Sequence, residues 1–189
     1  MPTLTSLVLN PPAVIAGSPS QGTVTLNGAA PAGGAVVSLS SSATNRATVP
    51  ATVTIPAGST SVTFPIQTIL AAQEGPVTIT AGFGGNLTAQ LNLVCLQSIG
   101  VIPSQISPGT EATGTLTLTG PVPTPTVANV SSQYPQLVSV PPTVTFPVNT
   151  TSVNFPIEAA TRSADETSTA VNIIGSLAGV TLSVQLLLI

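Results

Sequence analysis

The chain has 189 residues, of which only 2 are Lys or Arg and 5 are Asp or Glu, so charged residues make up 4% of it, against about 25% in an ordinary soluble domain. It has no His, no Trp and a single Cys. Most acid–base, nucleophilic and metal sites need several titratable groups close together, so the composition argues against an enzyme and against a bound cofactor or metal. Because a cationic surface is missing, we also expect no nucleic acid partner.

Short runs of alternating apolar and polar residues, separated by Gly, Pro, Asn and Ser, predict antiparallel strands along the whole chain. No segment shows helical periodicity. No apolar run approaches the ~20 residues of a membrane-spanning helix, so we expect no membrane insertion. In the first half the alternation predicts seven strands, near residues 4–9, 22–28, 34–41, 51–55, 60–67, 76–83 and 87–94.

The second half of the chain repeats the first. Residues 49–66 and residues 140–157 are identical at 12 of 18 positions. The segments that begin at Leu4 and Gly22 also recur, and the closing strand from Leu87 aligns with the one from Val180. The equivalent strands are predicted near residues 96–102, 114–119, 125–131, 142–146, 151–158, 169–175 and 180–188.

This repeat predicts two tandem domains, 1–95 and 96–189. In each domain the strands must form two packed sheets, because one sheet alone cannot bury its apolar face. The sequence therefore predicts an all-β protein.

The segments PAGGAVVSLSSS from Pro31 and ATVPATVTIPAGSTSVTFPI from Ala47 resemble the bacterial immunoglobulin-like repeats that occur in tandem in large secreted and surface proteins. The second unit keeps the strand pattern but has GPVPTPTVANVSS from Gly120 where the first has its glycine-rich turn. The resemblance implies two immunoglobulin-like Greek-key β-sandwiches of about seven strands each, without the antibody disulfide and Trp. It implies no activity. The Thr- and Ser-rich, Lys-free composition offers proteases few sites, so we expect a location outside the cell or at its surface.

The acidic residues do not form a recognisable calcium loop, since only Asp165 and Glu166 are neighbours in the sequence. Arg162 can pair with Asp165 as a weak exposed contact. We expect a solvated loop here, with calcium binding as the alternative. The remaining acidic residues are Glu74, Glu111 and Glu158.

Cys95 lies at the junction of the two units. A catalytic Cys needs a base, and the chain has no His to serve as one. We predict that Cys95 is a small buried apolar residue, with a disulfide to the Cys95 of another copy as the alternative.

Sugar-binding β-sandwiches use exposed aromatic faces, which this sequence hardly offers. Phe64 and Phe155 occupy equivalent positions in the repeat and are predicted core residues, as is Phe146. Only Phe83 and Tyr134 remain. A carbohydrate or host-surface ligand is thus an alternative that would rely on hydrogen bonds. Glycosylation sequons that begin at Asn86, Asn129 and Asn149 are expected by chance in a Thr- and Ser-rich chain, and we assign them no function.

The surface gives the strongest indication of function. Natural sheets protect their edges with Lys, Pro or bulges, and this chain has no Lys. Pro cannot donate to a ladder, so the strands that carry or flank repeated prolines are predicted edges or bulges. These prolines are Pro50, Pro56 and Pro65 in the first unit and Pro141, Pro147 and Pro156 in the second.

So few charges suit a surface that is covered by other copies of the chain. Leu187 and Leu188 interrupt the alternation, so one of them should face outward and contact another subunit. We predict a non-catalytic structural subunit that self-assembles into an extracellular filament, tube or sheath through β-edge and apolar contacts. The alternative is a passive spacer or adhesin repeat from a larger cell-surface protein.

Overall fold

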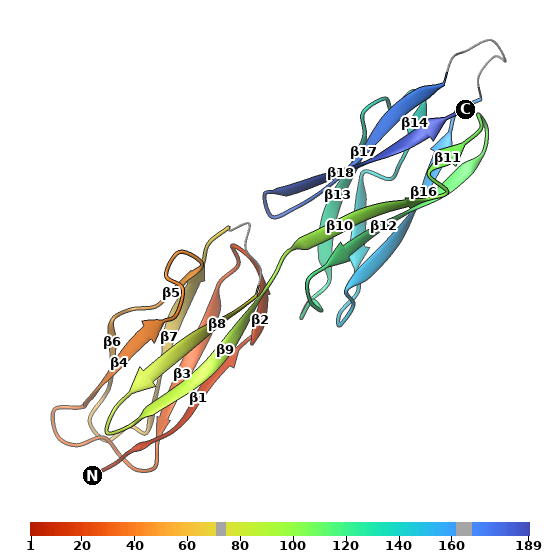
Figure 1. The fold of residues 1–189 in the computed structure, drawn as a ribbon. Helices are drawn as coiled ribbons and strands as arrows, with labels where there is room; N and C mark the ends of the chain where they lie inside the picture. The colour runs from red at the N-terminus through yellow and green to blue at the C-terminus, as the bar shows by residue number, and fades with distance from the viewer. Residues whose placement is uncertain (71–74, 162–167) are drawn as a thin grey trace. The chain divides into compact units, whose positions relative to one another are not determined.

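A computed structural model describes residues 1–70, 75–161 and 168–189. The chain forms two compact units, Met1–Val94 and Cys95–Ile189. Every regular element in the described residues is a β-strand (Figure 1).

The first unit contains two sheets. One is ordered β1-β3-β7-β5 and the other β2-β9-β8-β4-β6. The first sheet consists of β1 (Leu4–Asn10), β3 (Ser20–Leu26), β7 (Ser61–Thr68) and β5 (Ala47–Thr48). The second consists of β2 (Ala13–Ile15), β9 (Asn86–Val94), β8 (Gly75–Gly82), β4 (Ala35–Ser41) and β6 (Thr52–Ile55). After the cis Asn10–Pro11 peptide the chain passes from one sheet to the other, where β2 pairs parallel to β9.

The second unit has the same arrangement, ordered β10-β12-β16-β14 and β11-β18-β17-β13-β15. Its first sheet consists of β10 (Leu96–Ile102), β12 (Glu111–Leu118), β16 (Ser152–Ala159) and β14 (Val138–Ser139). Its second consists of β11 (Gln105–Ile106), β18 (Val180–Leu188), β17 (Thr169–Leu177), β13 (Thr126–Ser132) and β15 (Thr143–Phe146). Both units are immunoglobulin-like β-sandwiches, so the predicted fold class is confirmed.

Four short strands were not predicted from the sequence. They are β2, β5, β11 and β14, each of two or three residues, and a period-two pattern cannot be recognised over so few positions. The seven longer strands of each unit lie where the alternation places them, with ends that differ by a few residues.

The closing strands are aligned differently from the prediction. Val14 pairs with Leu93 in the first unit, and the equivalent Ile106 pairs with Leu188 in the second. Leu93 therefore corresponds to Leu188, whereas the sequence alignment matches it with Leu186. One residue of this shift is already present between β8 and β17, where Gly82 corresponds to Ser176. The other arises because the β17–β18 hairpin has one residue more than the β8–β9 hairpin, and it continues to a tighter turn. Since the shift is even, the inward faces still correspond.

The core of each unit comes from the alternating inward positions of both sheets. Phe64, Phe155 and Phe146 are all buried, as predicted. The ring of Phe64 lies over Gly22, its partner across the ladder between β3 and β7. Phe155 lies over Gly114 in the same way. The other fully buried large side chains are Ile55, Ile66, Ile79, Leu91, Leu116, Ile157, Ile173, Leu186, Leu188 and Val24.

The last strand resolves the doublet of leucines near the C-terminus. Leu188 is 1% exposed and faces the core, whereas Leu187 is half-buried on the outer face of the sheet. The prediction that one of the two faces outward is confirmed, and the outward residue is Leu187.

Candidate functional site

Cys95 is 8% exposed, which agrees with the predicted buried position. Its backbone N–H donates to Thr119 Oγ1 at 3.0 Å, and the Thr119 N–H donates to the Cys95 carbonyl at 3.0 Å. An equivalent pair of hydrogen bonds joins Thr3 and Asn27 at the start of the first unit. The Thr3 N–H donates to Asn27 Oδ1 at 2.9 Å, and the Asn27 N–H donates to the Thr3 carbonyl at 3.0 Å. Cys95 thus occupies a structural position at the start of the second unit.

The two aromatic residues left for sugar stacking lie in different units. Phe83 is half-buried and packs against the core of the first unit. Tyr134 is 37% exposed, and its hydroxyl accepts a 3.4 Å hydrogen bond from Gln133 Nε2. Neither unit therefore presents a pair of exposed aromatic side chains within its described residues.

The three sequon asparagines are exposed on the surface. Asn86 begins β9 and Asn129 lies in β13, while Asn149 lies in the turn before β16 with a φ of 62°. Exposure alone assigns them no role.

The structure brings together Glu111 and Glu158, two acidic residues that are far apart in the sequence. Glu111 of β12 lies directly opposite Glu158 of β16 in the antiparallel ladder. Residues opposite each other project from the same face of a sheet. Both side chains are exposed, so this outer face carries a pair of carboxylates. Of the other charged residues, Glu74, Arg162, Asp165 and Glu166 lie outside the described part of the chain.

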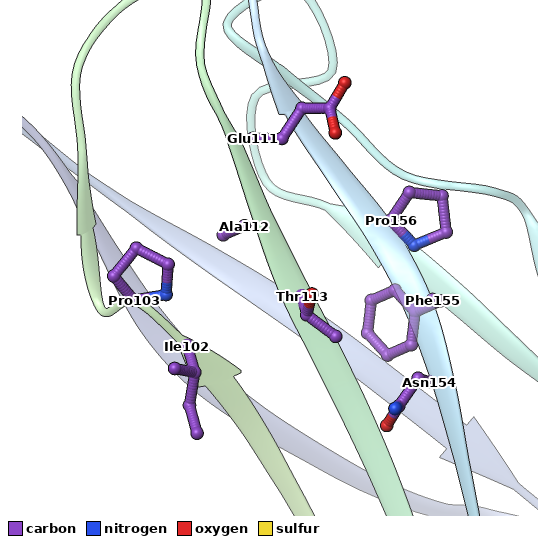
Figure 2. Close-up of a pocket in the computed structure, with 8 residues that line it drawn as sticks. All are labelled: Ile102, Pro103, Glu111, Ala112, Thr113, Asn154, Phe155 and Pro156. Carbon is purple, nitrogen blue, oxygen red and sulfur yellow. The ribbon is translucent and has the colours of Figure 1, made fainter.

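An open groove of ≈ 560 Å³ begins beside this pair. Figure 2 shows Ile102 and Pro103 on one side of β12 and residues 154–156 of β16 on the other, with Thr113 between them. Ile102 is 78% exposed, which makes it the most exposed large apolar side chain of the second unit. The groove is lined by Ile102, Pro103, Glu111, Ala112, Thr113, Asn154, Phe155 and Pro156.

Its polar wall is held in place by one hydrogen bond. Thr115 Oγ1 donates to Asn154 Oδ1 at 2.9 Å across β12 and β16. On the other side of Thr115 lies Gly100 of β10. No atom lies within 4 Å of the position that a Cβ would take at Gly100, so the outer face is open there.

The equivalent face of the first unit is uncharged. Gln67 pairs with Thr48 where Glu158 pairs with Ser139. Pro19 stands at the position of Glu111, one residue before the start of β3. Residues 1–94 contain one Arg and one Glu, while residues 95–189 contain one Arg and four acidic residues. The whole formal charge of −3 therefore belongs to the second unit.

The repeated prolines divide into those that flank β6 and β15 and those that lie within β7 and β16. Pro50 and Pro141 lie two residues before β6 and β15. Pro56 and Pro147 follow β6 and β15, and both strands are sheet edges, as predicted. Pro65 lies in β7, which has a neighbour on each side, so the prediction of an edge strand is wrong for β7 and for its equivalent β16. However, β5 and β14 pair only with the last two residues of these strands. Pro65 and Pro156 precede those residues, where the outer side of the strand is unpaired.

The described residues lack two other features that would indicate a function. Residues 1–70, 75–161 and 168–189 hold no group of three or more His, Cys, Asp or Glu side chains that could bind a metal ion. They also contain no helix long and apolar enough to cross a membrane.

Comparisons with known proteins give structural similarity alone. No protein-family model matches the sequence, and no curated protein matches it either. The C-terminal 282-residue fragment of intimin, solved with the intimin-binding domain of the translocated intimin receptor, is similar over 97% of this chain and 63% of that chain, with 10% identity and a TM-score of 0.45.

Two further solved structures are similar. Domains 4–9 of the surface layer protein SbsC align with 100% of this chain and 32% of that chain, at 16% identity and a TM-score of 0.33. The collagen adhesin of S. aureus aligns with 98% of this chain and 92% of that chain, at 10% identity and a TM-score of 0.32. The chain thus spans less than two thirds of the intimin and SbsC fragments. With scores this low, the fold assignment rests on the sheet topology.

Proposed function

We propose that the chain is a non-catalytic structural module of the bacterial immunoglobulin-like repeat type, which acts outside the cell or at its surface and binds copies of itself. The observation that carries this proposal is the nearly uncharged surface. Among the described residues the charged side chains are Arg46, Glu111 and Glu158. An isolated soluble domain ordinarily has about a quarter to a third of its surface charged.

The sheet edges offer a route to self-association. Strands β6 and β15 pair with a neighbour on one side only, and neither contains a charged residue. Beside them lie Val36 and Val127, which are 58% and 56% exposed at equivalent positions of the two units. A strand of another copy that pairs with such an edge would gain backbone hydrogen bonds and would extend the outer face on which the valine lies.

Edge pairing of this kind predicts assembly that resists salt, because backbone hydrogen bonds and apolar contacts are screened far less than ion pairs. Assembly is measured by light scattering against protein concentration, with negative-stain electron microscopy of the product. A single Lys on each edge, as in Thr54→Lys with Thr145→Lys, is expected to reduce assembly strongly.

Thr23→Lys is the matched control for Thr54→Lys and for Thr145→Lys, each made as a single substitution. Thr23 lies in β3 between Val8 of β1 and Thr63 of β7, so the same charge is placed on a strand that already has two neighbours. Equal effects of Lys at positions 23, 54 and 145 would show that net charge and not edge pairing controls assembly.

A passive spacer or adhesin repeat is the second candidate. The direct continuation of β9 through Cys95 into β10, without a linker, favours it, because tandem repeats are joined in this way in long arrays. A monomer at every concentration tested would support this function in place of self-assembly.

A further inference from the structure

We propose that the groove between Ile102 and Pro156 on the second unit binds a basic polypeptide segment, in which Lys or Arg side chains alternate with apolar residues. This inference goes beyond the proposed function and does not depend on self-assembly.

Charge is the first argument. Like charges directly opposite each other in a ladder are destabilising, so the pair Glu111 and Glu158 lowers the stability of its own sheet. Within the described residues, the one Lys or Arg side chain is Arg46, which belongs to the first unit and donates to the carbonyls of Gly75 and Pro76 at 3.4 and 3.2 Å. A cation supplied by a partner would relieve the repulsion between the two carboxylates.

The apolar lining is the second argument, and it separates a polypeptide from a metal ion. Calcium takes 6–8 oxygen ligands, whereas one carboxylate, that of Glu111, lines the groove. Glu158 lies opposite it in the ladder, outside the lining. An exposed isoleucine followed by a proline gains nothing from a hydrated ion. It gains from an apolar side chain that covers it.

The form of the groove is the third argument. It crosses three neighbouring strands, from the end of β10 over β12 to β16. Successive side chains of an extended segment point to opposite sides, so alternate residues face the groove at a spacing of about 7 Å. An Arg or Lys can then reach Glu111 while an apolar residue further along contacts Ile102.

The first unit supplies an internal comparison. Its equivalent face has Pro19 and Gln67 in place of the two carboxylates and Asn10 in place of Ile102. The carboxylates and an exposed isoleucine at this position are therefore confined to the second unit, while the first unit exposes Val8 where the second has Gly100. Binding to this unit but not to its neighbour in the same molecule is the specific expectation.

The test uses the full chain, labelled with ¹⁵N, and a blocked peptide of alternating Val and Arg as the probe. We expect its addition to shift the amide resonances of Ile102, Thr113 and Asn154 and to leave those of Asn10 and Gln21 unchanged. Replacing Arg by Gln in the peptide should weaken binding by about the same factor as removing the two carboxylates. Because an exposed ion pair contributes little, the double variant Glu111→Gln with Glu158→Gln should bind about fivefold more weakly.

The double variant is expected to fold, and its thermal midpoint should equal or exceed that of the parent because the repulsion is gone. Equal binding of the Arg peptide to parent and double variant would overturn the proposal. So would equal binding of the Gln peptide, or the absence of any shift. Shifts at Ile102 and Thr113 caused by calcium chloride alone, with none caused by the peptide, would show a cation site instead.

Discussion

A methyl group at position 22 would occupy space that is already filled by a buried ring. The Cβ of an alanine at Gly22 would lie 2.1 Å from Cζ of Phe64. Phe64 is 2% exposed and has no room to move toward solvent. We therefore expect Gly22→Ala to destabilise the first unit, although alanine is usually the better residue in a strand.

The magnitude follows from two opposing effects. Overpacking a well-filled core costs about 1–3 kcal/mol. Replacing Gly by Ala at an unstrained position increases the free energy of unfolding by about 0.4–1 kcal/mol, because the unfolded chain loses conformational freedom. The net loss of about 1–2 kcal/mol corresponds to a fall of about 5–15 °C in the melting temperature of a domain of this size. Gly114→Ala should do the same to the second unit, since its Cβ would lie 2.2 Å from the Phe155 ring.

Calorimetry of the full chain measures the effect, with Gly100→Ala as the matched control. Gly100 also lies in a strand outside the left-handed region, but nothing lies within 4 Å of its Cβ position. In a Phe64→Leu background, Gly22→Ala should cost at least about 1 kcal/mol less than it does alone, because the ring it meets has gone. If Gly22→Ala were as mild as Gly100→Ala, the account of this core contact would be refuted.

Three further variants test hydrogen bonds made by side chains. Thr68→Val removes the 2.6 Å bond to the Ser18 carbonyl and should cost about 1–2 kcal/mol in urea unfolding. Arg46→Gln removes the two bonds to carbonyls at the start of β8 and should speed amide exchange in that strand, with unchanged exchange in β17 as the internal reference. Thr119→Val removes the acceptor of the Cys95 N–H and should lower the free energy of unfolding of the second unit by about 1 kcal/mol. A loss of stability confined to the first unit would contradict this assignment.

The long strands and the core could be predicted because alternation is a local property of the sequence. Phe64 and Phe155 stand in Val-x-Phe patterns, so their side chains had to face the same way as those of the buried valines and isoleucines around them. The short strands β5 and β14 could not be predicted, since two residues carry no period and their pairing depends on the neighbouring strand β7 or β16.

The carboxylate pair was missed because it depends on the register between distant strands. Glu111 and Glu158 are 47 residues apart, and no local pattern connects them. One signal could have found the pair: each unit matches a glycine with a phenylalanine across the ladder, as in Gly114 with Phe155. In an antiparallel ladder, the residue three before Gly114 lies opposite the residue three after Phe155, and these two residues are Glu111 and Glu158.

Self-association is the central claim, and light scattering of the full chain tests it most directly. The experiment compares a concentration series in dilute buffer with the same series in about 1 M salt, where the screening length is only about 3 Å. The account predicts particles far larger than the 18.6 kDa chain in both series, and regular polymers by electron microscopy. A monodisperse monomer at all concentrations, or particles that dissolve in high salt, would contradict it.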